Sequence, residues 1–163
     1  MRFIALLSLL VFFAVHAIAA AADIATPKKI DAAALLAWAS GTATSALSFD
    51  FEDYQRVFTN AKRNFTPEGW QSFEDSLKKS QLPDIVVKYQ QTMYTEQNVT
   101  APPKIESQGL SDGVYQWTVS VPVKRTIHAG NKTAIGQETV TMTLVEKKAI
   151  FLPTLLVVHW EEK

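Results

Sequence analysis

The sequence predicts an α+β fold, in which helices in the first half of the chain pack against an antiparallel sheet built from the second half. Between residues 31 and 77, apolar side chains recur three or four positions apart, which is the spacing of amphipathic helices. From residue 85 onward they fall on alternate positions, which is the spacing of half-buried strands. Because the strands follow the helices and do not alternate with them, we expect an antiparallel sheet whose apolar face is closed by helices.

The first 22 residues predict export from the cytoplasm. Arg2 precedes an apolar run over residues 3–15, and Ala17 and Ala19 provide the small-x-small pattern of a cleavage site. We therefore expect a signal peptide over residues 1–19, with cleavage after residue 21 or 22 also open, or else an uncleaved membrane anchor over residues 3–22. A linker over residues 20–30 and a single α+β domain over residues 31–163 would follow. Either reading predicts a periplasmic domain, free or anchored to the inner membrane.

The first two helices are predicted from their start signals. Asp31 is a candidate N-cap for a helix that continues to about Leu47. Asp50 is a candidate N-cap for a second helix through Asn60, with Phe49 packed from outside the cap onto Tyr54.

A third helix has the clearest start signal in the chain. Thr66 is a capping residue, and Pro67 takes the first helical position, where the missing N–H costs nothing. Phe65, just before the cap, is expected to pack onto Trp70.

Four or five strands are predicted from alternation and turn signals. The expected strands cover residues 85–93, 104–108, 115–124, 139–144 and 155–160. Turns are expected at residues 111–113 and 129–131, each of which contains a glycine. The expected core joins aromatic residues of the helices to the apolar face of the sheet, namely Trp38, Tyr54, Phe58, Trp70, Phe73, Val87, Trp117, Val119 and Met142.

Composition limits the classes of partner. The 16 basic and 16 acidic residues cancel, and no basic stripe with interleaved aromatics is present, so we expect no nucleic-acid partner. The chain contains no cysteine, so the exported domain must rely on burial and not on disulfides. The histidines do not have metal-ligand spacing, and no nucleotide-binding loop is present. We therefore expect neither a metal nor a cofactor.

Two motif blocks resemble a known family. The first has the order Asp-Phe-x-x-Tyr, a short helix, then Phe-Thr-Pro-x-Gly-Trp-x-x-Phe, and the second reads Gly-x-Tyr-x-Trp-x4-Pro. The matching residues are Asp50, Phe51, Tyr54, Phe65, Thr66, Pro67, Gly69, Trp70, Phe73, Gly113, Tyr115, Trp117 and Pro122. This pattern resembles the periplasmic domain of DotI/IcmL, an inner-membrane component of Dot/Icm type IVB secretion systems, and TraM of related conjugation systems.

The resemblance implies a curved sheet wrapped round helices, in the manner of nuclear transport factor 2 and of the eighth VirB component of type IV secretion systems. It also implies a domain that binds protein partners, such as other envelope components of the secretion system, and catalyses nothing. Homo-oligomers are left open. Family members carry a cytoplasmic tail and a membrane anchor before this domain, whereas here the apolar segment begins at residue 3. The chain is therefore expected to be a periplasmic paralogue, which is either an accessory to the apparatus or a copy with another partner.

The alternative is an enzyme of the isomerase or dehydratase type, or a small-molecule binder, that uses the pocket of the same cone-shaped fold. Ketosteroid isomerase-like enzymes line that pocket with an Asp base and Tyr or Asp donors. The candidates here are Asp50, Tyr54, Tyr94 and His159. Each also has a simpler structural interpretation, and a shared fold alone does not establish a shared activity.

Overall fold

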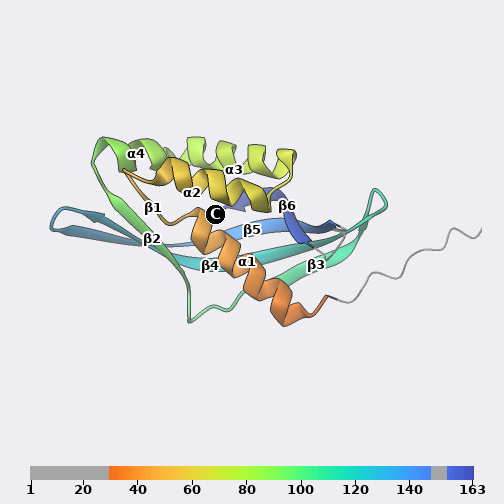
Figure 1. The fold of residues 1–163 in the computed structure, drawn as a ribbon. Helices are drawn as coiled ribbons and strands as arrows, with labels where there is room; N and C mark the ends of the chain where they lie inside the picture. The colour runs from red at the N-terminus through yellow and green to blue at the C-terminus, as the bar shows by residue number, and fades with distance from the viewer. Residues whose placement is uncertain (1–29, 148–153) are drawn as a thin grey trace, which may run out of the picture.

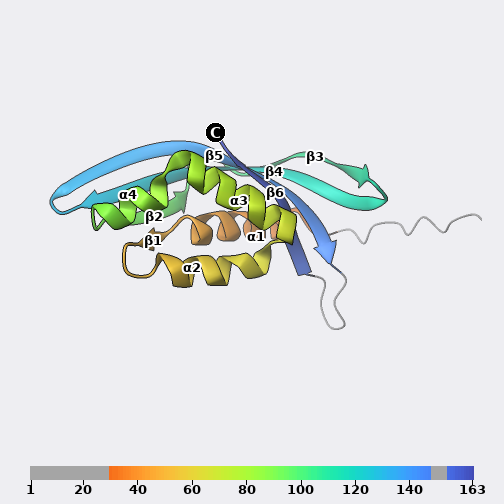
Figure 2. The same ribbon diagram turned by 90° about the horizontal axis from the view of Figure 1, so that it is seen from above.

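The computed structural model describes residues 30–147 and 154–163. In this part of the chain, helices lie along the concave face of a curved antiparallel sheet (Figures 1 and 2). This arrangement confirms the predicted α+β class and the helices-first order. The expected signal peptide, the alternative anchor and nearly all of the linker lie outside the described residues. Within the described part, no helix combines the length and the apolar character needed to cross a membrane.

Helix α1, Ala32–Ala46, begins where the sequence predicts. The Asp31 carboxylate accepts a hydrogen bond from the backbone N–H of Ala34 at 3.1 Å, which is an N-cap contact. The helix buries one stripe against the sheet, made of Leu35, Ala39, Ser40, Thr42, Ala43 and Ala46. Because most of these side chains are small, the helix backbone can lie close to the strands.

The second helix begins later than predicted. Residues Phe49–Asp50 form a short strand, β1, that pairs with β2 (Thr92–Gln97), so their backbone is extended and Asp50 does not cap a helix. The helix, α2, runs over Tyr54–Ala61 with Asp53 at the N-cap position, and a short 3-10 helix, η1, covers Lys62–Asn64. The ring of Phe49 packs edge-on against Phe58 at 5.0 Å, one turn beyond the predicted partner Tyr54.

The third helix, α3, confirms its predicted start and covers Pro67–Ser80. The Thr66 hydroxyl accepts from the backbone N–H of Gly69 at 3.1 Å. The rings of Phe65 and Trp70 pack edge-to-face with centroids 5.5 Å apart, as the predicted contact across the cap requires.

The strand predicted over residues 85–93 is wrong in its first half, which forms helix α4, Leu82–Lys88. Gln81 adopts a left-handed conformation with φ 56°, and Pro83 and Asp84 in the first turn both favour a helix start. Val86, which the strand interpretation pointed outward, is fully buried, whereas Val87 is 40% exposed. The expected core position of Val87 is therefore also wrong.

The remaining strands are longer than predicted. They are β3 (Lys104–Ser111), β4 (Val114–Ala129), β5 (Lys132–Lys147) and β6 (Thr154–Glu162). The sheet order is β1-β2-β4-β5-β6, and β3 pairs with the N-terminal half of β4, whose C-terminal half pairs with β2. The two predicted turns are confirmed, with left-handed backbone at Asp112, Gly113 and Gly130.

The core combines the helix aromatics with the inner face of β4, β5 and β6. Phe73 is fully buried and lies 5.1 Å from Trp160 and 5.8 Å from Phe58, measured between ring centroids. Trp70, Trp117, Val119 and Met142 are buried as predicted, whereas Trp38, Tyr54 and Phe58 are partly buried at the edges of the core.

The tip of the β4–β5 hairpin extends beyond the helices (Figure 1). We call β2 together with residues 123–138 of this hairpin the arm. Every residue from 130 to 137 is exposed, so both faces of the hairpin reach solvent at its tip.

Candidate interaction surface

The four residues that would line an isomerase-type pocket do not come together. The Asp50 carboxylate closes a turn by accepting from the backbone N–H groups of Glu52 and Asp53, both at 2.8 Å. Tyr54 packs edge-on against Phe58. Tyr94 is 59% exposed on the outer face of β2, and His159 lies on β6, on the other side of the β4–β5 ladder. The predicted pocket is therefore not assembled from these side chains.

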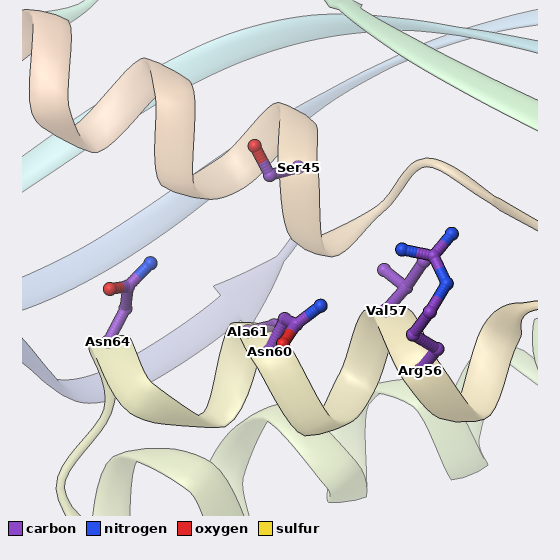
Figure 3. Close-up of a pocket in the computed structure, with 6 residues that line it drawn as sticks. All are labelled: Ser45, Arg56, Val57, Asn60, Ala61 and Asn64. Atoms are coloured by element: carbon purple, nitrogen blue, oxygen red, sulfur yellow. The ribbon is translucent and has the colours of Figure 1, made fainter.

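An open pocket of about 270 Å³ lies between α1 and α2 (Figure 3). It is lined by Ser45, Arg56, Val57, Asn60, Ala61 and Asn64. The Arg56 guanidinium is already paired with the Asp53 carboxylate. The lining offers amide and hydroxyl hydrogen bonds but no carboxylate, histidine or thiol to move a proton, so it can bind polar groups but lacks a general acid and base.

A second open pocket of about 270 Å³ lies beside His159, between α3 and β6. It is lined by Ser72, Asp75, Ser76, Lys79, His159, Trp160, Glu161 and Glu162. None of the other three proposed catalytic residues is among them. In the described part of the chain, no group of three or more His, Asp or Glu side chains is arranged to hold a metal ion.

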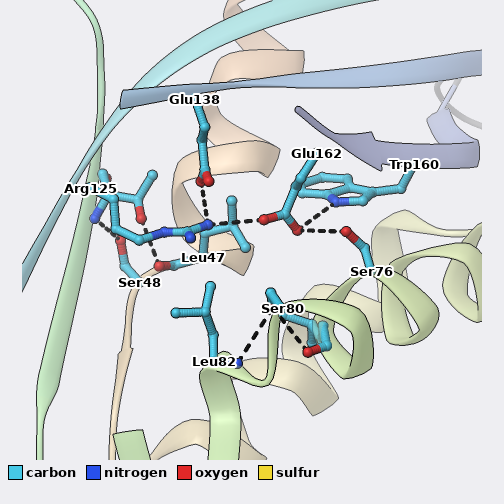
Figure 4. A network of polar contacts seen from close by, with 11 residues as sticks. Leu47, Ser48, Ser76, Ser80, Leu82, Arg125, Glu138, Trp160 and Glu162 are labelled. Carbon is cyan, nitrogen blue, oxygen red and sulfur yellow. Dashed lines mark hydrogen bonds and ion pairs between the residues drawn. The ribbon is translucent and has the colours of Figure 1, made fainter. Parts of the chain in front are cut away.

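A buried ionic network joins β4, β5 and β6 to α3 (Figure 4). Arg125 on the inner face of β4 is 8% exposed and forms ion pairs with Glu138 of β5 and Glu162 of β6. Glu162 also accepts hydrogen bonds from the Trp160 indole and the Ser76 hydroxyl, each at 3.1 Å. Burial raises the pKa of Glu138, although the Arg125 charge opposes this change, and the nearby Glu162 carboxylate raises it further. Because these groups are tied to one another and enclosed, the network is a structural connection and not an open site.

The arm is fixed to the body of the molecule through β2. The Thr95 hydroxyl donates to the backbone carbonyl of Leu47 at 2.7 Å, and the Thr95 N–H donates to the Ser48 hydroxyl at 2.9 Å. These contacts hold the end of α1 against β2, so the outer side chains of β2 have a defined direction.

The outer face of the arm has an aromatic and aliphatic row between polar rows. Tyr94, Thr126 and Ile135 are direct neighbours across β2, β4 and β5. Tyr94 is 59% exposed and Ile135 is 64% exposed. We call this surface the arm face, and define it by Tyr94, Glu96, Lys124, Thr126, His128, Thr133, Ile135 and Gln137.

Contacts on both sides of this row keep the arm face ordered. The Tyr94 and His128 rings pack edge-to-face at 5.9 Å, and His128 Nδ1 lies 3.0 Å from the Thr133 hydroxyl. On the other side, Lys124 Nζ lies 2.9 Å from a Glu96 carboxylate oxygen. An exposed aromatic ring held by its neighbours loses little entropy on binding, which is the property of anchor residues at protein interfaces.

The residues of the first motif block each take part in packing or capping. Phe51 and Tyr54 pack on the small cluster formed by Phe49, Val86 and Met93. Phe65, Trp70 and Phe73 stack on one another, and Thr66 and Pro67 start α3. Gly69 lies directly against the backbone of β6.

The second block shapes β4. Gly113, at φ 77°, makes the turn between β3 and β4, and the rings of Tyr115 and Trp117 pack 4.9 Å apart. Pro122 lies in the middle of β4, where its missing N–H would break a continuous ladder. It is tolerated because it lies between the ladder with β3, which ends at Ser120, and the ladder with β2, which begins at Val123. Its backbone carbonyl still accepts a hydrogen bond from the Asn98 N–H at 3.0 Å. Each of these motif residues therefore has a role in the fold.

Most of the chain matches the model of one known protein family. Residues 11–159 match the DotI/IcmL family model, described as an inner-membrane complex component of the type IVb secretion system. The chain belongs to the DotI/IcmL family. In sequence it matches none of the curated proteins with which it was compared.

Solved structures share the fold of this DotI/IcmL family member. The periplasmic domain of DotI superposes with a TM-score of 0.76 at 22% identity, covering 84% of this chain and 98% of that one. A periplasmic fragment of TraM gives 0.71 at 18% identity, covering 79% and 94%. An IcmL-like type IV secretion system protein from Legionella pneumophila gives 0.70 at 19% identity, covering 83% and 94%. These likenesses establish the fold.

The sequence patterns do not predict two features of the structure, which are Ile135 on the arm face and the ionic network around Arg125. Ile135 was overlooked because the turn-proximal part of β5 has a polar outer face, although a single large apolar residue between Thr133 and Gln137 was the available signal. In the sequence, the three members of the ionic network look like ordinary charged residues of alternating strand segments. They are Arg125, Glu138 and Glu162. Only the pairing of β4 with β5 and of β5 with β6 brings them together.

Proposed function

We propose that this chain is a periplasmic protein-binding component that acts within or beside a type IVB secretion-like envelope complex and catalyses no reaction. Membership of a family of inner-membrane complex components supports the setting. The arm face would supply the contact, and the partners would be other proteins of the envelope complex.

The observation that carries this proposal is the paired exposure of Tyr94 and Ile135 in one cross-strand row on the outer face of the arm. Within the described residues, Tyr94 packs edge-on against His128, but both Tyr94 and Ile135 stay more than half exposed. Contiguous apolar surface with a polar rim is typical of sites that bind other proteins. On the arm face, exposed Tyr94 and Ile135 lie on either side of Thr126. The Lys124–Glu96 pair and the His128–Thr133 contact flank this row.

The proposed location rests on the N-terminal sequence. We propose that residues 1–19 are removed on export and that the mature protein begins at or near Ala20. Amino-terminal sequencing of the protein from its host tests this. A first residue at or near Ala20 supports the proposal, and Met1 or Arg2 on a protein that sediments with membranes contradicts it in favour of an anchor over residues 3–22.

The experiment that separates binding from catalysis compares two sets of variants in the native host. One set changes the former pocket candidates singly to residues of similar shape, Asp50→Asn, Tyr54→Phe and His159→Gln. The other changes the arm face, Tyr94→Ala, Ile135→Asp and Lys124→Glu. Leu110→Asp is the matched control for Ile135→Asp, because Leu110 is 62% exposed on β3, outside the arm.

A binding component should lose co-purifying envelope proteins and its phenotype when the arm face is changed, and tolerate the conservative changes and the control. An enzyme should lose activity by orders of magnitude from a single shape-preserving substitution at unaltered stability. If one such substitution abolished the phenotype while every arm-face variant was silent, the proposed function would be wrong.

A further inference from the structure

The open pocket between α1 and α2 contains hydrogen-bonding groups that the fold does not use. We call this pocket, with the lining residues given above, the helix groove. Asn60 and Asn64 lie on its α2–η1 wall and Ser45 lies on its α1 wall (Figure 3). In the described part of the chain, no side-chain hydrogen bond engages the amide of Asn60 or Asn64. The neighbouring amide of Gln55, outside the groove, already donates to the Tyr54 hydroxyl at 3.2 Å.

The two free amides have the spacing of alternate residues in an extended peptide. Four residues advance about 6 Å along an α-helix and about 8 Å along a 3-10 helix. The segment from Asn60 to Asn64 passes from the first form to the second at Lys62, so its advance lies between these values. Alternate residues of an extended chain are about 6.7 Å apart, and their N–H and C=O groups point to the same side.

Each amide can therefore hold one residue of such a peptide. The amide oxygen accepts from the peptide N–H, and the amide nitrogen donates to the C=O of the same residue. Asn60 and Asn64 would then bind residues i and i+2 of one extended segment. The hydroxyl of Ser45 offers a further hydrogen bond from the opposite wall.

The shape of the helix groove suits a chain segment that passes through it. Val57 and Ala61 give apolar contact beside the two amides. Pockets for drug-sized molecules usually have about 300 to 1,000 Å³ and enclose most of their ligand. The helix groove has about 270 Å³ and is open, so a small molecule would keep much of its surface in water. An extended segment would bury only the residues that cross the groove.

The Asn64 end of the helix groove has an excess of positive charge. Lys62 and Arg63 immediately precede Asn64 and are exposed, and within the described residues neither takes part in an ion pair. The one carboxylate beside the other end, Asp53, is already paired with Arg56. No carboxylate lines the groove itself. An acidic side chain on the bound segment would complement this charge.

We propose that the helix groove binds an extended, acidic segment of a protein partner, and that Asn60 and Asn64 hold this segment through its backbone. The inference goes beyond the proposed function, which rests on the arm face. The arm face is on the outer side of the sheet, whereas α1 and α2 lie along its concave side (Figures 1 and 2). The domain would thus have two separate binding surfaces, and each can be tested without the other.

Random decapeptides displayed on phage supply the probe. The protein purified from its host is used for selection, and the selected peptides are synthesised with a fluorophore so that fluorescence polarisation gives their Kd. We expect Asp or Glu among the selected residues. Asn60→Ala and Asn64→Ala should each raise the Kd at least about tenfold, because each removes two hydrogen bonds. Gln55→Ala, on the same helix outside the groove, is the matched control and should stay within about twofold.

Methylation of the peptide backbone tests the same contacts without changing the protein. Each amide N–H of a selected peptide is replaced in turn by N–CH₃. The two positions that face Asn60 and Asn64 should each lose at least about fivefold in affinity, and they should be two residues apart. The position between them directs its N–H away from α2 and should be nearly insensitive.

Salt dependence tests the charge. Added sodium chloride should weaken peptide binding to the unmodified protein, because exposed charges are screened. The same addition should have a smaller effect on Arg63→Gln. An equal effect on both proteins would overturn the acidic character of the segment.

Loss of affinity from both asparagine variants, together with the alternating effect of methylation, would establish the proposed contact. Selected peptides that bind both variants as tightly as the unmodified protein would overturn it, as would a failure to select any peptide. Equal binding of a peptide of residues 20–29 would assign the groove to this chain itself, and a dimer that the asparagine variants dissociate would assign it to a second copy. Either result would overturn the assignment to a partner. The proposed function is unaffected by these outcomes, because Tyr94→Ala should leave peptide binding unchanged.

Discussion

A Cβ atom on Gly69 would lie 2.0 Å from the backbone carbonyl oxygen of Val157, a separation that real Cβ atoms do not tolerate. The same carbonyl accepts the N–H of Thr66 at 2.9 Å. The first turn of α3 is therefore in direct backbone contact with β6, and the glycine in the Thr-Pro-x-Gly-Trp motif is required by this approach. The contact sets the position of Phe65, Trp70 and Phe73 in the core.

Gly69→Ala should sharply lower the melting temperature, because the methyl group meets backbone atoms that cannot turn aside. We expect a loss of at least about 1 to 3 kcal/mol, the cost of overpacking a close contact. Gly41→Ala is the matched control, since Gly41 lies inside α1 and an added Cβ meets nothing within 4 Å. That change should stabilise the protein by about 0.5 to 1 kcal/mol, as Ala replaces Gly in a helix. Equal effects of the two substitutions on denaturant unfolding would contradict this account.

Trp70→Ala should cost about 3 to 5 kcal/mol, because the indole is 8% exposed and packs 5.5 Å from Phe65 and 5.1 Å from Phe73. Trp38→Ala, which removes a partly buried indole at the edge of the core, should cost less. Chemical denaturation of both variants checks the order. An unchanged unfolding midpoint for Trp70→Ala would mean that the indole is exposed.

Replacing Arg125 by Met should destabilise the fold by about 3 to 5 kcal/mol, because two carboxylates would lose their common cation inside the protein. The neighbouring Lys124→Met provides the control. Its ion pair with Glu96 lies on the surface, with side chains 39% and 65% exposed, and is expected to contribute less than about 1 kcal/mol. Similar losses from the two variants would argue against a buried network.

The pKa of Glu138 predicts a pH dependence. Burial raises this pKa in the folded state, so the folded protein holds the Glu138 proton more tightly than the unfolded chain does. The contribution of Glu138 to the free energy of unfolding therefore falls as pH rises from about 4.3, the ordinary glutamate pKa, through the raised pKa of the folded state. Above the raised pKa this contribution stays at its lower value. Glu138→Gln cannot titrate, so its stability relative to the unmodified protein should improve across this window. Urea denaturation at several pH values tests the sign, and a relative loss on raising the pH would refute it.

The fold was predictable where local chemistry and burial agree. Asp31 and Thr66 cap helices that also bury an apolar stripe, and the alternation through Val119, Val121 and Val123 matches a strand with one buried face. The sequence was misleading where tertiary pairing prevails. Asp50 is a good capping residue, but strand pairing of Phe49 with Met93 extends the backbone and delays the helix to Tyr54. Residues 85–93 alternate for a few positions only, and one buried turn around Val86 outweighs that pattern.

The candidate surface was less predictable than the fold. The sequence suggests Tyr94 as a pocket residue. In the structure the side chains of Met93 and Thr95 point toward the core, so Tyr94 between them points outward. Its neighbours Thr126 and Ile135 are 32 and 41 residues away in sequence, so their common row depends on the register of three strands. Such register is set by the whole hydrophobic pattern and by turn geometry, and not by any one motif.

Site-specific photocrosslinking in the native host tests the central claim most directly. A photoreactive amino acid at Tyr94, on the arm face, should give adducts with other proteins of the envelope complex. The same group at Glu68, exposed on α3 on the helical side of the sheet, should give none. Adducts from Glu68 with none from Tyr94, in proteins of equal abundance, would contradict the assignment of the arm face as the binding surface.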